Sequence, residues 1–63
     1  MQVVLTDIYD KDGNLLKIDV HDLDGNFVIQ IMWDENDPQT SENRKAFRQW
    51  ANRQLKQRDY IPQ

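Results

Sequence analysis

The chain has 63 residues, of which 38% are hydrophobic and 30% are charged, and its net charge is −3. This length leaves room for one small domain and excludes a two-domain enzyme. With no cysteine and a single histidine, the chain lacks the ligand sets of zinc and iron–sulfur sites, so we expect neither a cofactor nor a bound metal.

We expect neither a membrane span nor a signal peptide in this sequence. No apolar stretch approaches the roughly 18 to 20 residues that span a bilayer, and the first residues lack the basic start and long apolar run of a signal peptide. We therefore expect a cytoplasmic protein with no membrane partner. Small acidic chains are common among phage and mobile-element accessory proteins, an association that rests on size alone.

Charge and a short repeat organise the first part of the chain. Residues 1–40 carry eight Asp and one Glu against two Lys, a net charge of −7, whereas residues 41–63 carry +4. The acidic part contains the repeat DKDGN at 10–14 and DLDGN at 22–26. Asp-Gly between runs of alternating hydrophobicity is typical of a hairpin turn, because Gly accepts a positive φ. We therefore predict three strands in a meander, at 2–9, 14–21 and 26–33.

The two hairpin registers follow from the requirement that one sheet face be apolar. For the first hairpin we predict a three-residue loop at 11–13, with Gly13 in the left-handed conformation. This loop gives the pairs Val4–Val20, Thr6–Ile18 and Ile8–Leu16. For the second we predict a two-residue Asp24-Gly25 turn, since another three-residue loop would place Ile18 opposite Gln30. The shorter turn gives the pairs Val20–Ile29, Ile18–Ile31 and Leu16–Trp33.

A helix follows a polar linker at 34–39. Thr40 is the preferred N-cap, and Asp37 as the cap with Pro38 in the first helical position is the alternative start. Four apolar residues then recur at helical spacing and are predicted to face the sheet: Phe47, Trp50, Ala51 and Leu55. We expect one domain, with the sheet at 2–33, the helix at 40–58 and a short tail at 59–63.

The predicted fold is α+β, a three-stranded antiparallel β-meander packed on one face by a single C-terminal α-helix. Because the helix covers only one face of the sheet, the core should lie between these two layers. The predicted core residues are Val4, Ile8, Leu16, Ile18, Val20, Ile29, Ile31, Trp33, Phe47, Trp50, Ala51 and Leu55, with Phe27 at the margin.

The sequence offers no convincing catalytic or metal-binding group. Aligning either turn glycine with the sixth position of an EF-hand loop places Ile8 or Val20 at the first ligand position, so turn chemistry accounts better for these acids. His21 is predicted on the exposed face without a clear partner, and a sheet with one helix provides no obvious cleft. We therefore predict that the protein is not an enzyme.

The strongest functional signal is the run FVIQIMW at 27–33, which has no charge, Pro or Gly and is placed at a sheet edge. Unprotected edges of this kind accept strands from other chains. We predict a non-enzymatic protein-interaction module, either a homodimer or a small adaptor or inhibitor that docks a larger protein through this edge and the uncovered sheet face. Acidic turns favour a basic partner surface. The predicted partner-binding residues are Val28, Gln30, Met32, Val3, Leu5, Tyr9 and Leu15.

Two alternatives remain open. The tail at Tyr60 and Ile61 could cover the edge or part of the free face. The outer face of the helix could instead bind nucleic acid, because phosphate contacts are made by basic and amide side chains. The residues of that alternative site are Lys45, Gln49, Asn52, Arg53 and Lys56.

Overall fold

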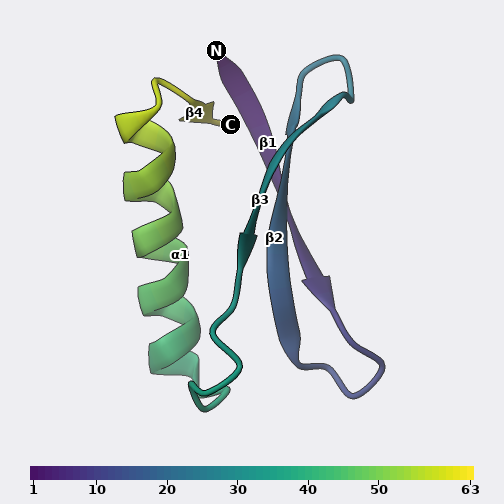
Figure 1. Ribbon diagram of the computed structural model, residues 1–63, viewed down its shortest axis with the longest axis vertical. Helices are drawn as coiled ribbons and strands as arrows, with labels where there is room; N and C mark the ends of the chain where they lie inside the picture. Colours follow the sequence, from purple (N-terminus) through teal and green to yellow (C-terminus); the bar gives the residue numbers. More distant parts are fainter.

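The computed structural model describes residues 1–63. Its elements, in chain order, are β1 (Gln2–Tyr9), β2 (Leu15–Asp22), β3 (Phe27–Met32), α1 (Ser41–Gln57) and β4 (Ile61–Pro62). The strands form one mixed sheet in the order β3-β2-β1-β4, and α1 lies along one face of it (Figure 1). The predicted α+β arrangement of a meander and one helix is confirmed, and the tail adds a fourth short strand.

Both copies of the repeat form the same turn. The Gly13 N–H donates to the Asp10 carbonyl at 3.1 Å and the Asp10 N–H donates to the Asn14 carbonyl at 2.9 Å, with the same distances in the second copy. Gly13 has a φ of 84° and Gly25 a φ of 87°, which glycine adopts without strain. The three-residue first loop is confirmed, and the predicted two-residue second turn is wrong.

A β-bulge follows each turn. Leu16 has no partner in β1, and Val28 has no partner in β2, although the residues on both sides of each are paired. Each unpaired residue lies two positions after the Asn that ends its repeat, so the repeated sequence specifies a turn and a bulge together. A bulge adds one residue to one strand and shifts the register beyond it.

The bulges decide which predicted pairs hold. In the first hairpin the bulge shifts β2 by one residue, so that Leu5 pairs with Val20. Three predicted pairs are therefore wrong: Val4–Val20, Thr6–Ile18 and Ile8–Leu16. In the second hairpin the longer loop and the bulge offset each other, and two predicted pairs are confirmed: Val20–Ile29 and Ile18–Ile31.

Because of the shifted register, the face of β1 that packs against the helix is the opposite of the predicted one. Val3 is fully buried against the helix, whereas Val4 is 38% exposed. In β2 the bulge likewise places Leu15 in the core and leaves Leu16 44% exposed. The predicted core positions Val4, Ile8 and Leu16 are therefore wrong. The cause is that β1 carries apolar residues in both phases, so its pattern alone does not select the buried face.

The core lies between the sheet and α1. The prediction is confirmed for six of its eight buried members: Ile18, Val20, Ile31, Trp33, Ala51 and Leu55. The other two buried residues, Val3 and Leu15, were predicted on the free face and lie in the core instead. Five half-buried residues pack against this core: Leu5, Val28, Ile29, Phe47 and Tyr60. Trp50, predicted in the core, is 44% exposed and lies at its margin.

The helix begins as predicted. The Thr40 backbone is extended, and its Oγ1 accepts a hydrogen bond from the Asn43 N–H at 3.1 Å. This side chain satisfies one of the helix N–H groups that have no partner within the helix. The alternative start, with Asp37 as the cap and Pro38 as the first helical residue, is wrong because both lie in the linker.

The helix ends in a Schellman motif. The Tyr60 N–H donates to the Leu55 carbonyl at 2.9 Å, and the Asp59 N–H donates to the Lys56 carbonyl at 3.1 Å. Asp59 adopts a φ of 59°, which reverses the chain direction at this point. The motif brings Tyr60 onto the core and directs the last residues toward β1.

These last residues cover the beginning of the β1 edge, at Gln2 and Val3. The Ile61 N–H donates to the Met1 carbonyl at 2.8 Å, and the Gln63 N–H donates to the Val3 carbonyl at 2.9 Å, so β4 runs parallel to β1. The tail therefore protects the first residues of the edge opposite to β3. The possibility that it covers the β3 edge is excluded by this pairing.

Candidate functional site

The edge of β3 is a border of the sheet that has no strand partner along its whole length. The Trp33 N–H donates inward to the Leu16 carbonyl at 3.0 Å, and along an antiparallel pair inward and outward backbone groups alternate. The backbone N–H and C=O groups of Gln30 and Met32 therefore point away from β2. No segment of the chain lies beyond β3 in the sheet, so these groups have no strand partner.

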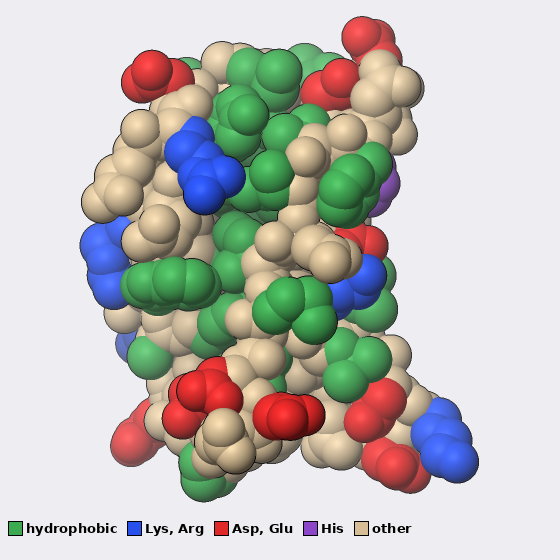
Figure 2. Space-filling view, in the orientation of Figure 1, with side chains coloured by type: hydrophobic (Ala, Val, Ile, Leu, Met, Phe, Trp, Pro, Cys, Tyr) green, Lys and Arg blue, Asp and Glu red, His purple; other side chains and the backbone are tan.

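An apolar groove opens between this edge and the helix. It has a volume of about 330 Å³, and its lining residues are Met32, Asp34, Asp37, Asn43, Ala46, Phe47 and Trp50. The Phe47 and Trp50 rings stack at 6.3 Å, and Phe47 meets Trp33 edge-on at 5.1 Å. Figure 2, which looks onto β3, shows a band of hydrophobic side chains between the helix and this strand. The core is thus visible from the side of the open edge.

A second groove lies on the outer side of the same strand. It has a volume of about 590 Å³ and lies among the first turn, the paired ends of β2 and β3 and the linker at 34–39. Leu16 and Met32 contribute apolar surface to it, and Asp10, Glu35 and Asp37 contribute carboxylates. Met32 and Asp37 line both grooves, so the end of the β3 edge lies between them.

The linker gives this end of the edge a negative charge. Asp34, Glu35 and Asp37 form no ion pair, since the two ion pairs of the protein join Lys17 to Asp19 and Arg48 to Asp7. The Asp34 carboxylate accepts the Asn36 N–H at 3.0 Å, which orders the turn. Asp and Glu side chains gather at this end of the molecule in Figure 2. A cationic group would therefore find complementary charge here.

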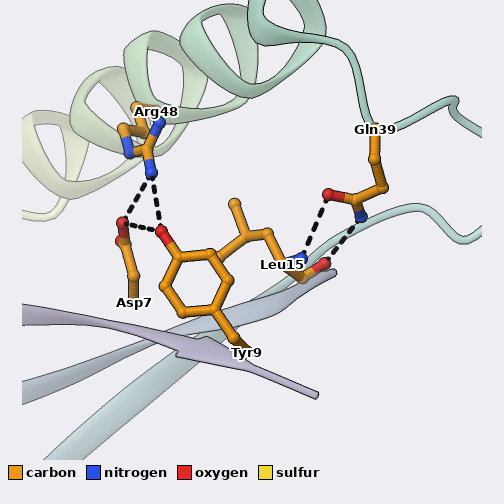
Figure 3. Close-up of polar contacts among 5 residues, drawn as sticks. All are labelled: Asp7, Tyr9, Leu15, Gln39 and Arg48. Atoms are coloured by element: carbon orange, nitrogen blue, oxygen red, sulfur yellow. Dashed lines mark hydrogen bonds and ion pairs between the residues drawn. The ribbon is translucent and has the colours of Figure 1, made fainter. Parts of the chain in front are cut away.

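A side chain of the linker fixes its position beside the sheet. The Leu15 N–H donates to Gln39 Oε1 at 3.0 Å, and Gln39 Nε2 donates to the Leu15 carbonyl at 2.9 Å (Figure 3). The Gln39 side-chain amide thus bonds both the N–H and the C=O of Leu15, as the backbone of one more β3 residue would do. Arg44 Nη2 donates to the Gln39 carbonyl at 2.8 Å. These contacts hold the acidic linker next to the end of β3, and nothing in the periodicity of the sequence indicated them.

Another polar group ties the helix to β1. Arg48 Nη2 donates to Asp7 Oδ2 at 2.6 Å and to the Tyr9 hydroxyl at 3.3 Å, and that hydroxyl donates to Asp7 at 3.2 Å (Figure 3). The hydrogen bond that Arg48 donates to Asp7 raises the pKa of Arg48 above its ordinary value. Tyr9, predicted on the free face, is therefore held on the helix side of the sheet.

The predicted partner-binding residues do not form one surface. Gln30 and Met32 lie on the open edge, and Met32 is 57% exposed. Val3 and Leu15 are fully buried, and Leu5 and Val28 pack against the core, so their prediction on the free face is wrong. The reason is the bulge after each turn, which exchanges the faces of neighbouring residues.

The free sheet face carries other residues instead. Its exposed apolar side chains are Val4, Leu16, Phe27 and Met32. Between them lies a polar centre, in which Lys17 Nζ contacts Gln30 Oε1 at 2.9 Å and Asp19 Oδ1 at 3.4 Å. His21 lies edge-on to Phe27 at 5.8 Å. Because the centre is polar, the apolar side chains do not merge into one patch.

The alternative nucleic-acid site keeps its predicted exposure. All five of its residues are exposed along the outer face of α1, and none of its cations forms an ion pair: Lys45, Gln49, Asn52, Arg53 and Lys56.

No helix of the protein has the length and apolar character to cross a bilayer. No group of three or more His, Cys, Asp or Glu side chains is placed to hold a metal ion.

Local hydrogen bonds stabilise the charged form of the Asp10 and Asp22 carboxyls in the two turns. A hydrogen bond from the Asn14 backbone N–H, supported by the Asn14 side chain and the Asp12 N–H, lowers the pKa of the Asp10 carboxyl. Asn26 lowers the pKa of Asp22 in the same way. The carboxylates thus serve as turn acceptors, which agrees with the interpretation of the repeat as turn chemistry.

These turns predict a pH dependence of stability. Because both carboxyls ionise more readily in the folded chain, they stabilise it above the unfolded pKa of about 4, and this contribution disappears as the pH falls through the lower folded pKa. We expect the thermal midpoint to fall on acidification below about pH 4. The fall should be shallower in Asp10→Asn/Asp22→Asn, which keeps an acceptor oxygen. Equal acid slopes for both proteins would contradict this.

Comparisons of this chain with protein-family models, with curated proteins and with solved structures give no match. Its function is therefore inferred from its own geometry.

Proposed function

We propose that the protein is a non-enzymatic interaction module that binds another polypeptide as an added strand on the edge of β3. The observation that carries this proposal is the outward direction of the Gln30 and Met32 backbone groups, which have no partner in the sheet. Strand addition satisfies such groups with main-chain hydrogen bonds, while neighbouring grooves select the side chains of the partner.

The two edges of the sheet are treated differently, which supports this proposal. The edge of β1 is paired with β4 at Gln2 and Val3, and β1 carries Asp7 further along, whereas β3 carries no charge or Pro that would discourage pairing. Its bulge at Val28 lies near the turn, so the stretch from Ile29 to Met32 pairs regularly with β2. This stretch is the part of the edge that lies beside both grooves.

The proposal predicts that edge substitutions reduce binding without unfolding the protein. We expect peptides selected on the wild-type protein from a displayed library of random dodecapeptides to bind Gln30→Pro at least about tenfold more weakly, because one outward N–H is lost. Met32→Lys should have a similar effect by placing a charge between the grooves. The measurement is fluorescence anisotropy of the selected peptides, with circular dichroism to verify the fold.

Thr6→Lys is the matched control, because it adds the same charge to an exposed strand position two strands away from the edge. Its affinities should equal those of the wild-type protein. Strand addition would be refuted if the selected peptides bound the edge variants as tightly as the wild-type protein. It would also be refuted if no peptide were enriched on the wild-type protein over Gln30→Pro and sedimentation showed a concentration-independent monomer. Binding of duplex DNA at low salt that is lost only in Lys45→Ala/Arg53→Ala/Lys56→Ala would favour the helix face instead.

A further inference from the structure

The grooves beside the β3 edge differ in chemistry. The groove on the helix side is walled by Ala46, Phe47 and Trp50, and Asp34 and Asp37 line its end beside the linker. The groove on the outer side is lined by the carboxylates of Asp10, Glu35 and Asp37 and by one cation, Lys17, whose ammonium pairs with Asp19 and donates to Gln30. The aromatic rings of Phe47 and Trp50 therefore belong to the helix-side groove, whereas the outer-face groove has three carboxylates and a lysine that is already paired.

A strand added at this edge would place its side chains in both grooves. Successive side chains of a strand point to opposite faces of the sheet, and a neighbouring strand lies about 4.8 Å away. A segment bonded to Gln30 and Met32 would therefore direct alternate side chains toward α1 and toward the outer-face groove. Each set of side chains meets a different groove.

We infer that the added segment is cationic and amphipathic, with apolar side chains directed at Phe47 and Trp50 and with Lys or Arg side chains directed at the carboxylates of the outer-face groove. This inference rests on the proposed function and names the chemistry of its partner. Aromatic surface binds apolar side chains through burial, and the unpaired carboxylates attract cations most strongly where solvent is partly excluded.

The charges also indicate that the occupant is not a second copy of this chain. The strand that a second copy would offer edge to edge, FVIQIM in β3, contains no Lys or Arg. Its addition would leave Asp34, Glu35 and Asp37 without a cation. The partner is therefore a different polypeptide with a basic extended segment.

Three displayed dodecapeptide libraries test this inference. In each, Val, Ile, Leu or Phe alternates with a second residue class, which is Lys or Arg, Ser or Thr, or Asp or Glu. We expect the wild-type protein to retain the cationic library at least about tenfold better than the neutral one, and the acidic library least, with a preference that weakens as salt is raised.

Charge-removing variants locate the effect. Asp37→Asn, which alters the residue common to both grooves, should weaken binding of a selected cationic peptide about threefold, as expected for one partly exposed ion pair. Asp24→Asn is the control, because it removes the same charge from the turn at the opposite end of β3 (Figure 1). This control should bind as the wild-type protein does.

The outcomes separate the inference from the proposed function. Retention of the neutral library as well as the cationic one, with both lost in Gln30→Pro, would overturn the cationic partner and leave strand addition standing. Equal weakening by Asp37→Asn and Asp24→Asn would also overturn it, since only net charge would then matter. No retention of any library above Gln30→Pro, together with a concentration-independent monomer in sedimentation, would overturn the proposed function as well.

Discussion

Replacing Ile31 with Lys should unfold the protein. Ile31 is 7% exposed and lies in the core that joins β3 to α1, so a lysine there would bury an unpaired charge and lose an apolar side chain. Such a change costs about 5 kcal/mol or more, which is comparable to the whole stability of a domain of this size. Far-UV circular dichroism and urea titration should show no cooperative transition.

The neighbouring substitution Met32→Lys is the matched comparison. Met32 is 57% exposed and points to the opposite face of the same strand, so its replacement should change the free energy of unfolding by less than about 1 kcal/mol. Together the two variants test which face of β3 is buried. A stable Ile31→Lys protein with an unfolded Met32→Lys protein would show that the opposite face is buried.

Removal of residues 60–63 should destabilise the protein strongly, because the tail is a strand of the sheet. The shortened chain loses the backbone bonds of Tyr60, Ile61 and Gln63, each contributing about 1 kcal/mol, and it loses the packing of Tyr60 on the core. We expect a loss of about 3 to 5 kcal/mol in the free energy of unfolding, measured by urea titration.

Ile61→Ser separates the backbone pairing from the side chain. Ile61 is 60% exposed, so this variant keeps the pairing with Met1 and should lose less than about 1 kcal/mol. If the shortened chain were as stable as the wild-type protein, the tail would contribute no structural strand, and the edge of β1 would be open as well.

The architecture could be predicted because its signals are local. The repeated Asp-Gly turns specified two hairpins, and the Thr40 cap with the spacing of Phe47, Ala51 and Leu55 specified the helix. The second hairpin register was right despite the wrong turn, because two one-residue differences offset each other. A register that places the apolar residues on one face is therefore compatible with more than one type of turn.

The faces of β1 could not be predicted because bulges leave little trace in a hydrophobic pattern. Val3 and Leu5 alternate as well as Val4 and Ile8 do, and only the unpaired Leu16 decides between them. A comparison of the two repeats could have shown that equivalent turns require equivalent bulges. Together the two bulges placed four of the seven predicted partner-binding residues in or against the core: Val3, Leu5, Leu15 and Val28.

The candidate site was predictable only in part for a similar reason. The uncharged run in β3 indicated an open edge, and Gln30 and Met32 do lie on it. The grooves beside that edge depend on contacts across distant parts of the chain, such as the bonds between Gln39 and Leu15. Pairings of this kind follow from tertiary structure and carry no local sequence signal.

Residue-resolved amide hydrogen exchange of β3 tests the central claim most directly. In the dilute free protein the Gln30 and Met32 amides should exchange rapidly, whereas the Ile31 amide, which points toward β2, should be protected. Addition of a selected cationic peptide should protect Gln30 and Met32 as well. Protection of these two amides in the free monomer, or their continued rapid exchange in the peptide complex, would contradict an open edge that binds an added strand.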